Sequence, residues 1–313
     1  MFLDNVLIAA KQVAILYLIV AVGAVSSKIK IFPEDTATKC TNLLFYVVTP
    51  AKIIESFLVL DYSTEKIKSF FIAMGCGMLM HIIAAVFSRF TFNKSGADKK
   101  CIYKYASTYG NCGYMALPLA NAVLGAEGVS YCSAVIVSFQ IFSFTHGIYT
   151  MNIGNTKEKV EINFKRIILN PGVIAVIIGL PLFLLPFDLP DIVTTPITYV
   201  GSLNTPLAML IFGTYIANTG FKSVFSDWRL WSVGLIKLII LPLVMLGTFK
   251  LMGLSGALLT SLILSAGAPP ANNTVMFAAK YDRNKGLASQ VVATVSFISI
   301  LTMPLMIGIA SVV

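Results

Sequence analysis

Two hydrophobic stretches of the chain are interrupted at their centres by helix-breaking residues, about half a chain apart. The first interruption is Tyr109 to Gly113 (YGNCG), which leads to Pro118, and the second is Gly267 to Asn273 (GAPPANN). A bilayer core holds no water to satisfy freed backbone groups, so unwound backbone must there be buried in protein or line a cavity. A matched pair of such interruptions predicts the ligand site of a secondary transporter.

The residues at the interruptions favour the binding of an anion. Proline suits the first position of a helix, so Pro118 and the pair Pro269-Pro270 are expected to begin second half-helices. The free N–H groups and positive dipole end of such a helix attract an anion without a charged side chain. Asn111 and Asn273 would add amide groups. The alternative is that these residues only kink packed helices.

Charged side chains within the apolar stretches are few. Lys52 and Glu55 are three residues apart on one helix face, and we expect a structural brace rather than a role in substrate or proton handling. Lys237 is expected to extend toward the nearer end of its helix, where its ammonium would reach water. Gln140 is expected to form interhelical hydrogen bonds rather than to bind a ligand.

The sequence shows no pattern of an enzyme or a cofactor protein. It has no nucleotide-binding glycine loop and no pair of nucleophile and base, and its five cysteines have neither metal-ligand nor disulfide spacing. We therefore expect no catalytic site, metal or cofactor. Cys112 differs from the other cysteines because it lies inside the first interruption, which makes it a candidate site residue.

The composition is that of a polytopic membrane protein. Hydrophobic residues make up 57% of the 313 residues and charged residues only 12%, whereas soluble domains carry about a quarter charged residues. Ten apolar stretches are long enough to cross a bilayer. They cover residues 6–26, 36–60, 67–90, 102–123, 129–150, 167–187, 191–219, 228–252, 255–279 and 286–312.

The net charge of +9 is arranged by loops. Of the 23 Lys and Arg residues, 17 lie in or beside the odd-numbered connections and three in or beside the even-numbered ones. The positive-inside rule then predicts cytoplasmic odd connections and extracytoplasmic termini. Because the charges are scattered over many loops, we expect no nucleic-acid partner.

The two halves of the chain repeat short motifs in the same order. Thr49-Pro50 recurs as Thr205-Pro206, and Pro118 matches Pro270, each with an asparagine three residues later. We expect a first five-helix repeat over 1–152, a short cytoplasmic linker over 153–166 and a second repeat over 167–313. An odd number of helices per repeat inserts the two halves in opposite directions. The predicted fold is all-α, with ten helices in two inverted repeats and broken crossover helices 4 and 9.

Four segments together resemble the auxin efflux carrier family, which includes plant PIN-formed auxin exporters and bacterial malate and malonate permeases. The resemblance extends over essentially the whole chain. The segments are Asn42 to Ala51, Asn111 to Leu119, Asn170-Pro171, and Pro269 to Tyr281.

The resemblance implies an elevator-type carrier. Helices 1, 2, 6 and 7 would form a scaffold that dimerises, and helices 3–5 and 8–10 a mobile transport domain. By motif match, Asn111 and Asn170 would contact a substrate carboxylate, and Thr49 would line the scaffold side of the site.

The sequence as a whole predicts a secondary transporter of small organic anions in the plasma membrane. Monocarboxylates and dicarboxylates such as malate, malonate or auxin-like acids are the expected substrates. A sodium-coupled organic-anion carrier of the bile-acid type is the first alternative, since unwound carbonyls bind sodium in other transporters. A membrane sensor that binds an anion without moving it is the second.

Overall fold

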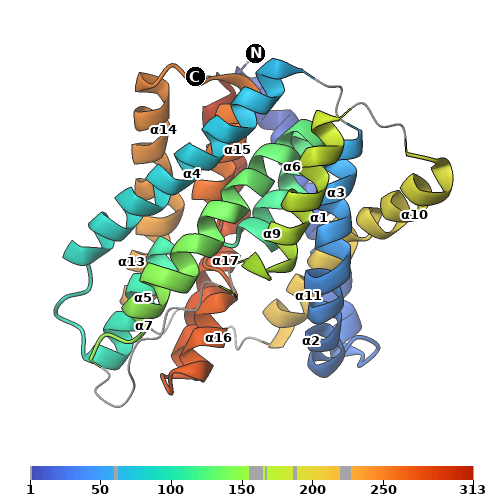
Figure 1. Ribbon diagram of the computed structural model, residues 1–313. Helices are drawn as coiled ribbons and strands as arrows, with labels where there is room; N and C mark the ends of the chain where they lie inside the picture. The colour runs from blue at the N-terminus through green and yellow to red at the C-terminus, as the bar shows by residue number, and fades with distance from the viewer. Residues whose placement is uncertain are drawn as a thin grey trace.

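The computed structural model describes residues 2–59, 63–154, 165, 168–185, 189–218 and 227–312. Within these ranges the chain is almost entirely helical, and its helices form a bundle with both chain ends at the same end (Figure 1). The predicted helical class is therefore confirmed. The predicted linker over 153–166 lies almost wholly outside the described residues.

The first half of the chain contains seven described α-helices and three π-helical turns. The α-helices are α1 (Phe2–Lys28), α2 (Glu34–Leu43), α3 (Thr49–Leu58), α4 (Thr64–Phe90), α5 (Ala97–Thr108), α6 (Leu117–Phe142) and α7 (Ile148–Met151). The π-turns are η1 (Leu44–Val48), η2 (Cys112–Ala116) and η3 (Ser143–Gly147). Gly125 divides α6 into two arms, because it adopts φ 65° and ψ −151°, a conformation that is open to glycine alone. The two arms belong to the separate stretches that were predicted over 102–123 and 129–150.

The second half of the chain is also helical. Its described elements are α9 (Pro171–Leu184), α10 (Asp191–Ser202), α11 (Asn204–Asn218), α13 (Trp228–Leu235), η4 (Ile236–Ile240), α14 (Leu241–Leu251), α15 (Gly256–Ala266), α16 (Asn273–Lys280) and α17 (Lys285–Val312). Among the described residues of the whole chain, five continuous helical segments are long and apolar enough to cross a membrane. They are Thr64–Phe90, Leu117–Met151, Asp191–Asn218, Trp228–Leu251 and Lys285–Val312.

Prolines account for three of the four π-turns. Pro50, Pro118 and Pro242 each lie two residues beyond the end of a π-turn, η1, η2 and η4 respectively. Proline removes one helical hydrogen bond and its ring crowds the preceding turn, and a locally widened turn relieves that crowding. Pro118 lies in the first turn of α6, as expected, but helical backbone already begins before this helix, in η2. The half-helix begins at Cys112, and Pro118 follows within it.

The helices pack in two groups, which are joined where α1 packs on α17 and where α6 packs on α3 and α9. The helix α1 packs along α11, and α3 packs against α9 and α10; α4 and α15 both pack against α6, and α13 and α16 pack against α17. Gly23 and Gly213 explain how closely α1 approaches α11. A Cβ atom at Gly23 would overlap the backbone of α11, and one at Gly213 would overlap the backbone of α1. Small residues permit this kind of backbone contact between membrane helices.

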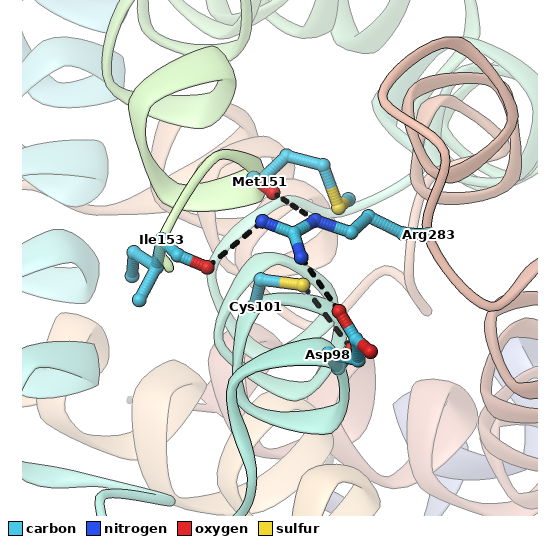
Figure 2. Close-up of polar contacts among 5 residues, drawn as sticks. All are labelled: Asp98, Cys101, Met151, Ile153 and Arg283. Carbon is cyan, nitrogen blue, oxygen red and sulfur yellow. Dashed lines mark hydrogen bonds and ion pairs between the residues drawn. The ribbon is translucent and has the colours of Figure 1, made fainter. Parts of the chain in front are cut away.

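One arginine joins the ends of three helices. The guanidinium of Arg283, which follows α16, lies between α5 and the end of α7 (Figure 2). Its Nη1 is 2.6 Å from Asp98 Oδ1, its Nε donates to Met151 O at 3.1 Å, and its Nη2 donates to Ile153 O at 2.9 Å. Planar guanidinium groups suit such multiple hydrogen bonds, so Arg283 holds segments that are distant in sequence.

Candidate functional site

The two interruptions that the sequence predicts are present, and they pair with each other. Gly110 and Pro270 form an isolated antiparallel β-bridge. The Asn111 N–H donates to Pro269 O at 2.6 Å, and the Ala271 N–H donates to Tyr109 O at 3.0 Å. The unwound backbones therefore satisfy part of each other's hydrogen-bonding requirement, which is the condition for non-helical chain within an apolar environment.

Four half-helix ends meet at this crossing. The helices α5 and α15 end at Thr108 and Ala266, and η2 and α16 begin at Cys112 and Asn273. The second half-helix of the later interruption therefore begins three residues beyond Pro270, because both prolines lie in the unwound segment. The N–H groups in the first turn of η2 and α16 carry partial positive charge, and the last carbonyls of α5 and α15 carry partial negative charge.

A cavity of about 50 Å³ lies at the crossing. This volume accommodates a few water molecules. Thr49, Asn111, Cys112, Asn170 and Asn273, which the sequence analysis selected, all line it. The other lining residues are Phe45, Gly110, Gly113, Ile136, Phe139, Gln140, Gly172, Ala271 and Asn272. None of these described lining residues is charged, and Pro118, Pro269 and Pro270 are buried outside the lining set.

Two polar residues of the cavity wall are held by hydrogen bonds. Asn170 caps the N-terminus of α9, because its Oδ1 accepts from the Gly172 N–H at 2.9 Å. Thr49 Oγ1 accepts from Asn204 Nδ2 at 2.9 Å. These bonds leave the amide nitrogen of Asn170 and the hydroxyl hydrogen of Thr49 as the groups that can donate to a ligand.

A chain of hydrogen bonds connects Asn273 in the cavity wall to the buried Tyr105 of α5. Asn273 Nδ2 donates to Ser143 Oγ at 3.3 Å, and Ser143 Oγ is 2.7 Å from Tyr105 Oη. Tyr105 in turn packs on Tyr109, with ring centroids 4.6 Å apart. The half-buried Asn273 therefore fixes the start of α16 to η3 and α5 through Ser143 and Tyr105, which are both buried.

Gln140 has a different place from the one expected. It is 5% exposed, it lines the cavity, and its Oε1 has no hydrogen-bond partner among the described residues. Interhelical hydrogen bonds were expected for Gln140, and its Oε1 forms none in the described part of the chain. An unsatisfied buried amide oxygen costs free energy, and a water molecule or a hydroxyl group of a ligand in the cavity could donate a hydrogen bond to it.

Lys237 also departs from its prediction. Instead of extending toward water, its side chain is 3% exposed, and its Nζ donates to Ala266 O at 2.9 Å. The other two charged candidates lie elsewhere, on α3: Lys52 Nζ is 3.0 Å from Glu55 Oε2, and each side chain is 12% exposed.

Asn204, which donates to Thr49 in the cavity wall, was not predicted from the sequence. Its one signal is its place directly before the repeated Thr205-Pro206 pair.

Comparison with protein families agrees with this geometry. The family model described as "Membrane transport protein" matches residues 8–307, which is nearly the entire chain. The chain belongs to this family. It is the family of the auxin efflux carriers and their PIN-like relatives, so the resemblance seen in the four sequence segments is confirmed. A search of curated proteins finds no match. Family membership and the apolar helices together identify a multi-pass membrane transport protein.

Proposed function

We propose that the protein is a secondary carrier of small organic anions, with monocarboxylates or dicarboxylates such as malate, malonate or auxin-like acids as substrates. One observation supports this proposal above the others: two half-helices begin at one cavity whose described lining residues are uncharged but rich in amides. Helix N-termini bind carboxylates through N–H groups and dipole. Phe45, Ile136 and Phe139 offer apolar contacts for the organic part of the substrate.

Each polar group has a defined part in the proposed site. The N–H groups of Gly113 and Asn273, at the starts of η2 and α16, bind the carboxylate, since those of Cys112, Thr274 and Val275 already donate to backbone carbonyls. The amides of Asn111, Asn170 and Gln140 orient it. Hydrogen bonds to a charged group contribute about 1.5–3 kcal/mol each. The loss of one such bond therefore weakens binding by about tenfold or more.

The movement that we propose is an elevator. The scaffold contains the predicted helices 1, 2, 6 and 7, which correspond to α1, α2 with α3, α9, and α10 with α11. The packing of α1 on α11 and of α3 on α9 and α10 supports this grouping. The remaining helices carry the crossing and move as a rigid transport domain, and the repeats over 1–152 and 167–313 are inverted relative to each other.

The proposed placement in the membrane follows the charges. The predicted odd connections bear most of the Lys and Arg residues, and the starts of α2 and α5 and the ends of α7 and α16 lie at one end of the bundle, opposite the chain ends (Figure 1). We place the former end in the cytoplasm and the termini outside. The carrier acts in the plasma membrane as a homodimer joined through the scaffold.

A carboxylate screen tests the proposal. Purified protein is heated with a panel of mono- and dicarboxylates, and the acids that raise its unfolding temperature are then tested for uptake into proteoliposomes. Asn111→Ala should weaken binding of the best acid by about tenfold or more. Asn93→Ala, which changes an exposed loop asparagine, should leave binding unchanged. Binding of neutral or cationic solutes in place of every carboxylate would refute the proposal.

A further inference from the structure

Lys237 is a charged residue that contacts the crossing at Ala266 and Gly110 without lining the cavity. It lies in the π-turn η4, and its Nζ donates to Ala266 O at 2.9 Å. A Cβ atom at Gly110 would be 2.9 Å from that Nζ and 3.0 Å from Lys237 Cε. The ammonium group is thus packed against the residue that forms the β-bridge and also lines the cavity.

The hydrogen-bond acceptor of this ammonium is a backbone carbonyl at the end of α15. Ala266 is the last residue of α15, so its carbonyl is one of those left unpaired at the negative end of the helix dipole. Ala268 O also lies beside Gly110, 3.0 Å from the same Cβ position. In the described part of the chain, no carboxylate lies within ion-pair distance of Lys237, and its ammonium donates to the Ala266 carbonyl. The Cys112 thiol and the His81 imidazole lie near enough to interact with its charge.

Carbonyls at a broken helix are the ligands that bind sodium in many secondary transporters, where the C-terminal ends of half-helices and the unwound backbone coordinate the ion. A tethered ammonium offers the same single positive charge and donates hydrogen bonds to the same oxygens. Unlike a sodium ion, the ammonium group is covalently attached to the protein and does not leave the site.

We propose that Lys237 is the resident cation of the crossing. Its ammonium occupies the position of a coupling sodium ion, compensates the carbonyl end of α15, and makes carboxylate transport independent of sodium. The last of these statements depends on the proposed function, whereas the first two concern the structure of the crossing alone. Lys237 is in this sense a positioning residue, which acts on the substrate through the Gly110 backbone.

The structural part is tested without substrate, by thermal unfolding of purified variants in choline chloride, sodium chloride or methylammonium chloride. Wild-type protein should unfold at the same temperature in all three salts. Lys237→Ala should unfold several degrees lower in choline and should recover in methylammonium, which fits the space that the side chain leaves. Lys237→Met should be lowered without recovery, because its side chain fills that space. Lys68→Met, at an exposed lysine of α4, is the control and should match wild type.

Two results would overturn the structural part. The first is that Lys237→Ala unfolds at the same temperature as wild type in choline chloride. The second is that sodium raises the unfolding temperature of wild type by as much as methylammonium raises that of Lys237→Ala. If the alanine variant does not fold, the methionine variant and the wild-type salt series still decide the question.

The transport part is tested with any carboxylate that the wild-type protein takes up. Uptake into proteoliposomes should be equal with sodium or choline outside, and Lys237→Met should bind that carboxylate at least about tenfold more weakly. Uptake that requires sodium would overturn this part. If no carboxylate binds to wild-type protein, the proposed function fails, while the unfolding temperatures still test the resident cation.

Discussion

Gly113 offers a sharp test of where the substrate lies. It is the second residue of η2 and lines the cavity, and a Cβ atom built on it has no heavy atom within 4 Å. Alanine at this position therefore places one methyl group in open space within a cavity of only about 50 Å³. The methyl group displaces ligand atoms rather than protein atoms, so Gly113→Ala changes the size of the site with little change in the fold.

The expected effects on binding and on stability have opposite signs. A well-placed ligand atom contributes up to about 1.5 kcal/mol, so the loss of one contact weakens carboxylate binding by up to about tenfold. Alanine is favoured over glycine in helices by up to about 1 kcal/mol, so the unfolding temperature should stay the same or rise. Gly75, inside α4, also has no heavy atom within 4 Å of its Cβ position, and Gly75→Ala is the matched control.

The assay combines thermal unfolding with titration of the best carboxylate for wild type, Gly113→Ala and Gly75→Ala. Both variants should be at least as stable as wild type, and only Gly113→Ala should bind more weakly. The loss should also grow with the size of the acid, because the methyl group occupies space that larger acids need. Unchanged affinity for every acid in Gly113→Ala would show that the substrate does not occupy this cavity.

Three further substitutions test the contacts that hold the helices in place. Arg283→Ala should lower the free energy of unfolding by about 3 kcal/mol or more, because three charge-assisted hydrogen bonds are lost. Asp98→Ala removes a side chain that is 70% exposed and should cost at most about 1 kcal/mol. Equal losses of the two variants on denaturant titration would contradict the role given to the guanidinium. Glu55→Gln should cost about 3–5 kcal/mol because it leaves a largely buried lysine charge, while methionine at both Lys52 and Glu55 should be close to neutral. A double variant as unstable as the single one would argue against a structural brace. Gly213→Ala should separate α1 from α11, because its Cβ atom would overlap the α1 backbone, and a monodisperse, wild-type elution profile on size exclusion would refute this.

The interruptions and their asparagines were predictable because glycine and proline carry their backbone preferences in the sequence itself. Thr49, Asn111 and Asn170 also reach the cavity, as the family motifs imply. What local sequence does not contain is the direction of a side chain within an apolar helix. Gln140 and Lys237 each sit in a continuous apolar stretch, where nearly every face is equally hydrophobic. Tertiary packing alone turns Gln140 toward the cavity and Lys237 toward Ala266.

The prolines show a second limit of sequence reasoning. A proline in an apolar stretch predicts a disturbed helix, but the disturbance at Pro118 is a widened turn that precedes it, and at Pro269-Pro270 it is an extended segment. The difference depends on the unwound backbone segment that lies opposite. The Pro269 carbonyl accepts a hydrogen bond from the Asn111 N–H across the crossing, and no local sequence pattern specifies that donor.

The bridge between Gly110 and Pro270 is made by main-chain atoms. In the proposed site, attraction for negative charge likewise comes from peptide groups, which every amino acid supplies. Mutation of the surrounding side chains can then exchange one acid for another during evolution without rebuilding the means of recognising the carboxylate. Diversification of substrates among carriers of this design would accordingly proceed through the walls of the cavity, with the crossing itself left intact.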